Sequence, residues 1–85
     1  MTKEAIYETI MQVITAGFFG LGCFEEWVGA NGNYIRIIVD SDMRTITAES
    51  DEKVKYTMHY CNTWMDMHRF MAFIYECLGM EDWHK

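Results

Sequence analysis

The stretch NGNYIRIIVDSDMRTITAESDE, residues 31–52, decides the fold of this chain because it predicts two consecutive β-hairpins. The dipeptide Asn31-Gly32 between apolar runs is the strongest short-range signal of a two-residue hairpin turn. Ile35 and Ile37 flank Arg36, and polar and apolar residues alternate from Thr45 to Ala48, as they do in strands that bury one face. We therefore expect an antiparallel sheet at the centre of the molecule.

A two-residue turn at Ser41-Asp42 would set the register of the second hairpin. In that register Ile37 lies opposite Ile46, and Ile35 lies opposite Ala48, so that one face of the hairpin is apolar. The opposite face is polar and holds Arg36, Thr45 and Thr47.

The first hairpin begins with a strand from about Cys23 to Ala30. Either simple register of this strand puts Glu25 or Glu26 on the apolar face. A β-bulge would let Phe24 and Trp27 both point inward while the two acids point outward. We therefore expect a bulge in this strand.

An amphipathic helix is predicted from Thr2 to Ala16, with Thr2 as its N-cap. Its apolar residues recur at the spacing of one helical face: Ile6, Ile10, Val13 and Ile14. Gly17 is expected to end the helix in a left-handed conformation. The glycines from Gly17 to Gly22 leave a helix instead of opening one, which does not fit a phosphate-binding loop.

After Asp51 the apolar residues recur three or four apart, as in a helix: Val54, Met58, Cys61, Met65, His68, Ala72, Tyr75 and Leu78. One helix of this length would span about 40 Å, which exceeds a domain whose radius of gyration should be about 12 Å. Asn62-Thr63 offers a second N-cap, so we expect two helices here or one that bends. The alternative is a strand from Val54 to Tyr60.

These elements predict a single α+β domain over residues 1–85, in the order α-β-β-β-α-α. A three-stranded antiparallel sheet would be flanked by an N-terminal helix and by one or two C-terminal helices. The alternative strand after Val54 would give the order α-β-β-β-β-α instead.

Charge and composition exclude several classes of partner. Thirteen Asp and Glu against seven Lys and Arg give a net charge of −6, which disfavours direct contact with nucleic acid or an acidic membrane. No run is long and apolar enough to span a membrane, and the N-terminus lacks the order of a signal peptide. Three unclustered cysteines indicate a reducing compartment. We therefore expect a cytoplasmic protein.

No arrangement of residues predicts catalysis or a cofactor. His59 and Cys61 are close in sequence, and His68 follows seven residues later, but structural zinc sites present paired ligands at fixed distances. No local signature joins a cysteine to a histidine base. We therefore expect no metal, no cofactor and no enzymatic activity.

Two surfaces are candidates for binding another protein. The first is a group of acidic residues around the second hairpin, suited to a partner with a basic surface: Asp40, Asp42, Glu49, Asp51 and Glu52. The second is the methionine-rich C-terminal helix, which has apolar residues on nearly every side and could form a homodimer. Its candidate residues are Met65, Met67, Phe70 and Met71.

The order of elements, the acidic bend and the small acidic chain resemble phage-encoded anti-CRISPR proteins, most of all those that block CRISPR nucleases as DNA mimics. The resemblance lies in residues 34–42 and 44–52 and in the helix up to Trp64. It implies that the five acids meet basic residues of a nuclease, in the cytoplasm of a bacterial host cell. We therefore expect a non-enzymatic protein-binding inhibitor or regulator. The alternative is a small structural or adaptor subunit that docks or dimerises through the methionine-rich helix.

Overall fold

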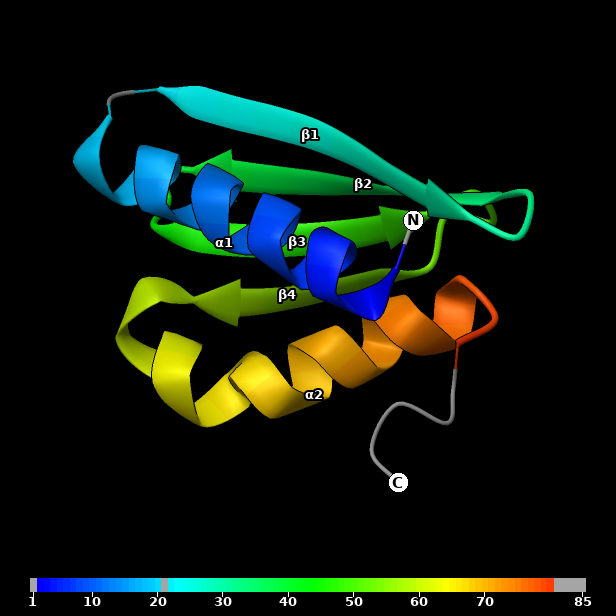
Figure 1. The fold of residues 1–85 in the computed structure, drawn as a ribbon. Helices are drawn as coiled ribbons and strands as arrows, with labels where there is room; N and C mark the ends of the chain where they lie inside the picture. The colour runs from blue at the N-terminus through cyan, green and yellow to red at the C-terminus, as the bar shows by residue number, and fades with distance from the viewer. Residues whose placement is uncertain (1, 21, 81–85) are drawn as a thin grey trace.

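The computed structural model describes residues 2–20 and 22–80, and within them the chain is an α+β fold (Figure 1). Its elements are α1 (Lys3–Phe19), β1 (Cys23–Ala30), β2 (Asn33–Asp40), β3 (Thr45–Ser50), β4 (Lys55–His59), the 3-10 turn η1 (Tyr60–Asn62) and α2 (Thr63–Cys77). The α+β class is confirmed. The predicted three strands are corrected to four and the C-terminal helices to one, which is the order α-β-β-β-β-α.

The four strands form one antiparallel sheet in the order β1-β2-β3-β4, and both helices lie on the same face of it (Figure 1). The helices bury apolar residues against that face: Ile6, Ile10, Ile14, Met67, Phe70, Met71, Ile74 and Tyr75. The sheet supplies Val28, Ile35, Ile37, Val39, Ile46, Ala48 and Met58. No helix in the described residues is long and apolar enough to cross a membrane.

The first hairpin turns as predicted at Asn31-Gly32, whose φ angles are 56° and 79°. Two positive φ angles are the signature of the turn that matches the twist of the flanking strands. The expected bulge is wrong, because β1 pairs with β2 without interruption from Cys23 to Ala30. Glu26 lies on the helix-facing side, but β1 is an edge strand and the side chain stays exposed.

The second hairpin has a four-residue loop, residues 41–44, in place of the two-residue turn. The Asp40 carboxylate accepts hydrogen bonds from the backbone N–H groups of Asp42 and Met43, at 3.0 and 3.1 Å, and so holds this longer loop. The register is therefore shifted by two residues from the predicted one, and Ile37 pairs with Ala48. A shift of two keeps every side chain on its predicted face, so Ile35 is buried as expected.

The predicted helix after Asp51 is a turn followed by β4. Ser50 and Val54 close the turn, since the Ser50 N–H donates to the Val54 carbonyl at 2.9 Å. Lys53 adopts a left-handed φ of 67° there. From Lys55 onward side chains alternate between the two faces of the sheet, and α2 begins only at Thr63.

Helix α1 starts as predicted, with the Thr2 hydroxyl accepting a hydrogen bond from the Ala5 N–H at 3.1 Å. Gly17 does not end it, because the helix continues to Phe19. A Cβ added at Gly17 would lie 2.1 Å from Cγ1 of Val39 on β2. The glycine thus lets the helix approach the sheet closely.

Candidate functional site

The face of the sheet opposite the helices is uncovered within the described residues, and the pairing of the strands aligns its side chains in rows. One row crosses all four strands and contains Trp27, Arg36, Glu49 and Lys55. A second row contains Glu25, Ile38, Thr47 and Thr57. We call the surface that these eight residues form with Tyr34 the open face.

An ion-pair network fixes the centre of the open face. The guanidinium of Arg36 donates to the carboxylate of Glu49 at 2.6 Å and to that of Glu25 at 3.2 Å. The Lys55 ammonium lies 4.0 Å from the second oxygen of Glu49. The hydrogen bond from Arg36 lowers the pKa of Glu49 and raises the pKa of Arg36 itself. The carboxylate of Glu49 is thus satisfied within the sheet.

Two aromatic side chains stand beside this network. Trp27 and Tyr34 are each 56% exposed, and the Arg36 guanidinium lies 5.9 Å from the centre of the Trp27 ring. Tyr34 pairs with Gly29, and a Cβ at Gly29 would meet the Tyr34 ring at 2.8 Å. The absence of a side chain at Gly29 therefore lets this ring lie over β1, on the same face as Trp27.

The five acidic residues predicted to bind a partner lie at both ends of β3 and do not form one patch. Asp40 ends β2 and Asp42 lies in the loop before β3, whereas Asp51 and Glu52 follow β3. The six residues of β3 separate the two groups by about 20 Å. Glu49, the fifth acid, is buried in its pairing with Arg36 on the open face.

Two of these acids also hold backbone groups in place. Asp40 binds the loop N–H groups described above, and the Asp51 carboxylate accepts a hydrogen bond from the Tyr34 N–H at 3.1 Å. Asp42 and Glu52 are exposed. Partner binding by these five acids stays a prediction, and Asp51 with Glu52 adjoins the aromatic end of the open face.

The four residues predicted for self-association are mostly inside the domain. Met67, Phe70 and Met71 are buried in the core between α2 and the sheet. Met65 alone among them is exposed, at 78%, and Trp64 beside it is equally exposed. The part of α2 that could pair with another molecule is therefore its first turn.

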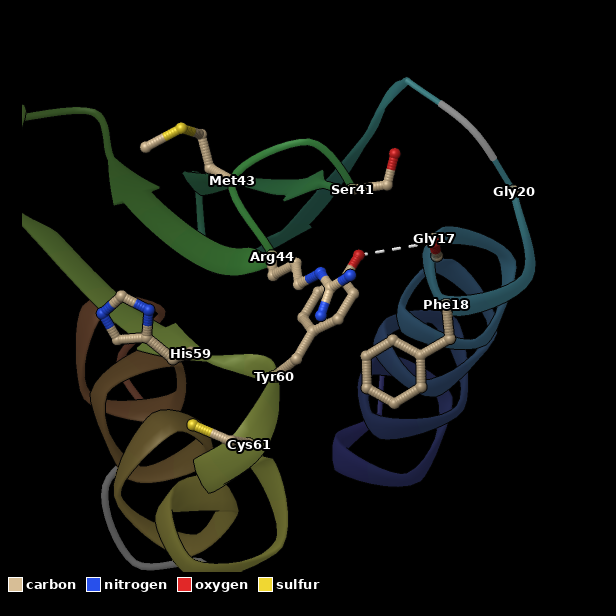
Figure 2. A pocket seen from close by; sticks show the side chains of 9 residues that line it. All are labelled: Gly17, Phe18, Gly20, Ser41, Met43, Arg44, His59, Tyr60 and Cys61. Carbon is tan, nitrogen blue, oxygen red and sulfur yellow. Dashed lines mark hydrogen bonds between the residues drawn. The ribbon is translucent and has the colours of Figure 1, made fainter.

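A cleft of about 740 Å³ lies at the end of the molecule where α1 ends and α2 begins (Figure 2). It is lined by Gly17, Phe18, Gly20, Ser41, Met43, Arg44, His59, Tyr60 and Cys61. The Tyr60 hydroxyl donates to the Gly17 carbonyl at 3.3 Å, and the Phe18 ring lies 4.5 Å from the Tyr60 ring. Burial, and then the charge of Asp40, raises the pKa of Tyr60.

The polar groups of this end cleft do not form a reactive pair. His59 and Cys61 are both exposed, and no hydrogen bond joins their side chains. Within residues 2–20 and 22–80 no three His, Cys, Asp or Glu side chains are grouped so that they could hold a metal ion. The expected lack of a metal and of catalysis stays a prediction.

The sequence reasoning missed Trp27 and Tyr34 as surface residues. The assumed bulge turned Trp27 toward the core, whereas the uninterrupted register places it on the same face as Arg36, the residue that the alternation had already placed outside. The sequence held a signal for this: side chains of a strand point alternately to its two faces, and counting back from the turn at Asn31-Gly32 places Trp27 on the outer face. Family models, curated proteins and solved structures offer no match to this chain.

Proposed function

We propose that this domain is a non-enzymatic protein-binding module, an inhibitor or regulator, whose partner docks on the open face of the sheet. The observation that carries the proposal is the exposure of Trp27 and Tyr34 beside Arg36. Tryptophan, tyrosine and arginine are the residues that most often supply the binding energy of protein interfaces. Both helices cover the other face of the sheet, so a partner on this face would complete a layer that the chain leaves open.

Charge supports a protein partner with a basic surface. The chain carries a net charge of −6, and Glu25, Asp51 and Glu52 border the aromatic residues of the open face. Phosphate groups would be repelled by these carboxylates, whereas lysine and arginine side chains would be attracted. A CRISPR nuclease with a basic nucleic-acid-binding site is the narrower form of this proposal and rests on the sequence resemblance.

We assign no catalytic role to the end cleft. Its exposed His59 and Cys61 are not positioned by each other, and a nucleophile needs an adjacent base within hydrogen-bond reach.

Comparison of two exposed tryptophans tests the proposal. The immobilised protein would capture partners from a bacterial lysate, in parallel with Trp27→Ala on the open face and Trp64→Ala on α2. We expect Trp27→Ala to lose a partner that the wild type retains and Trp64→Ala to keep it, because hot-spot tryptophans cost 2 kcal/mol or more on truncation, about 30-fold in affinity. Capture that depends on Trp64 and is indifferent to Trp27 would contradict the proposal.

Such a result would favour the second candidate, a structural or adaptor subunit that pairs through the start of α2. The observation behind that candidate is the exposure of Trp64 and Met65, at 78% each. Sedimentation at micromolar concentration decides it. A dimer that dissociates in Trp64→Ala would support the adaptor, and a monomeric wild type would remove self-association from consideration.

A further inference from the structure

Strand β1 is a free edge of the sheet. It has β2 on one side, and among the residues that the structure describes no strand or helix lies beyond its other side (Figure 1). At eight residues it is longer than β4, the five-residue strand at the opposite edge. Its register with β2 contains no bulge and the chain contains no proline, so the usual devices that blunt an edge strand are missing apart from charge.

The parity of the β1–β2 pairing shows which backbone groups of β1 point outward. Ala30 and Asn33 close the two-residue turn and so exchange hydrogen bonds. At the other end the Ser41 N–H donates to the Gly22 carbonyl at 3.0 Å. Gly22 lies eight residues before Ala30, an even number, so the backbone groups of both residues point toward β2. The N–H and C=O groups of the alternate residues Cys23, Glu25, Trp27 and Gly29 consequently face away from β2.

A shallow groove of about 280 Å³ runs along this edge between β1 and α1. It is lined by Thr9, Gln12, Val13, Ala16, Phe24, Glu25 and Glu26. A strand added 4.7–4.9 Å beyond β1, at the usual spacing of a sheet, would send alternate side chains toward this groove and toward Trp27 on the open face. The helix side of the groove offers short or polar side chains, which leave room for the added strand.

Charge selects the occupant. Glu25 and Glu26 are adjacent in the strand, so one carboxylate lies on each face of the sheet at the same point of the edge. A second copy of this chain paired antiparallel through β1 and centred on Glu25 or Glu26 would bring four carboxylates together, which opposes self-association in those registers. An extended segment with two adjacent basic residues would place one beside Glu26 and the other beside Glu25, whose side chain is 47% exposed although its carboxylate also pairs with Arg36 at 3.2 Å.

We infer that the β1 edge binds an extended basic segment of a protein partner as a fifth strand of the sheet. The inference rests on the proposed protein-binding function and adds to it how the partner binds. Main-chain hydrogen bonds to Glu25, Trp27 and Gly29 supply the pairing. The Lys or Arg pair meets Glu25 and Glu26, and an apolar residue two positions along the segment lies beside Trp27.

Nuclear magnetic resonance of the ¹⁵N-labelled protein tests this pairing with a defined probe. The probe is an acetylated, amidated eight-residue peptide of alternating Val and Thr with one central Lys-Arg pair. We expect slower amide hydrogen exchange at Glu25, Trp27 and Gly29, whose N–H groups point outward. The amides of Glu26 and Val28 already bond to β2 and should change little.

Two substitutions at one position separate backbone pairing from charge. Glu25→Gln removes the carboxylate and should weaken the peptide several-fold, with a smaller salt dependence. Glu25→Pro removes both the carboxylate and the outward N–H without breaking the β1–β2 pairing. It should therefore weaken peptide binding about tenfold more than Glu25→Gln does. Glu76→Gln on α2 is the charge control, and the peptide N-methylated on its pairing side is the ligand control; circular dichroism checks that each variant folds.

The outcomes distinguish this inference from the proposed function. Absence of amide protection on β1 at millimolar peptide, or equal affinity of Glu25→Pro and Glu25→Gln, would overturn the fifth strand. If the fifth strand were overturned and Trp27→Ala still lost the captured partner, the proposal that a partner binds the open face would remain, and only the pairing at the β1 edge would be rejected. If the peptide protected the β1 amides but the captured partner bound Trp27→Ala as well as the wild type, the edge site would be supported and binding at the open face would be rejected.

Discussion

Substitution of Gly17 by alanine measures how closely α1 approaches the sheet. The new Cβ would lie 2.1 Å from Cγ1 and 2.8 Å from Cβ of Val39, well inside van der Waals contact. Overpacking of this kind costs about 1–3 kcal/mol, whereas alanine in place of glycine within a helix gains about 1 kcal/mol. Because the added Cβ meets two atoms of Val39 at once, we take the upper half of that range, about 2–3 kcal/mol, and expect a net loss of about 1–2 kcal/mol, or roughly 4–16 °C in melting temperature for a domain of this size.

The loss of stability should shrink when Val39 is shortened. Val39→Ala alone should cost about 2 kcal/mol through the cavity that it leaves. In that background the contact with Cγ1 is gone and only the one with the Cβ of residue 39 remains, at 2.8 Å, so Gly17→Ala should cost about 1 kcal/mol less than in the wild type. Ala16→Gly, at an exposed position of the same helix, is the control and should cost about 1 kcal/mol in both backgrounds.

Urea unfolding of the four proteins followed by circular dichroism gives the coupling energy. If Gly17 were a left-handed helix stop, alanine would cost about 1–2 kcal/mol of backbone strain whether or not Val39 were shortened. An equal loss in both backgrounds would therefore refute the close approach of α1 to β2.

Three further predictions concern groups whose surroundings differ from water. The pKa of Glu49 is lowered by Arg36, so their pairing stabilises the fold above the usual carboxyl pKa of 4.5, and this stabilisation is lost as the pH falls below it. If the urea midpoint of unfolding is plotted against pH, Glu49→Gln should therefore flatten the acid side of the curve. The side-chain amide of Asn31 donates a hydrogen bond to the Leu78 carbonyl at 2.8 Å, so Asn31→Asp should lower the free energy of unfolding by about 1–2 kcal/mol in thermal unfolding. Asn31→Gly should cost less, because it keeps the left-handed turn and adds no negative charge at the end of α2. Burial and, to a smaller extent, the charges of two nearby glutamates raise the pKa of Cys77 above 9.0. Iodoacetamide at pH 8 should therefore label Cys77 more slowly than the two exposed cysteines. Peptide mass spectrometry would measure the rates, and equal rates would contradict this prediction.

The central sheet could be predicted because its signals are local. Asn31-Gly32 carries its own turn geometry, and the isoleucines on either side of Arg36 indicate which face of β2 meets the core. The loop after Asp40 was not predictable at the same level, because the hydrogen bonds from its carboxylate to the loop N–H groups select a four-residue loop. The error left the core intact, since a shift of two residues preserves the face of every side chain.

The fourth strand was hidden by an ambiguity in the apolar pattern. Val54 and Met58 are four apart, a spacing that serves one face of a helix and equally one face of a strand, where every second residue points the same way. Val54 is 53% exposed in the turn, so it belongs to neither face. The deciding interactions are those between Ser50 and Val54, which form only when the chain has already turned back on β3.

The acidic residues show why charge in a sequence does not by itself locate a binding site. Asp40 and Asp51 satisfy backbone N–H groups, and Glu49 pairs with Arg36, so three of the five predicted acids already have partners in the fold. Acids concentrate in turns because their oxygens accept bonds from N–H groups that no strand satisfies. The informative acids are those whose surroundings the fold leaves open. Glu26, exposed on the helix-facing side of an edge strand, meets that condition. Glu25 on the other face meets it in part, since its carboxylate pairs with Arg36 at 3.2 Å and its side chain is 47% exposed.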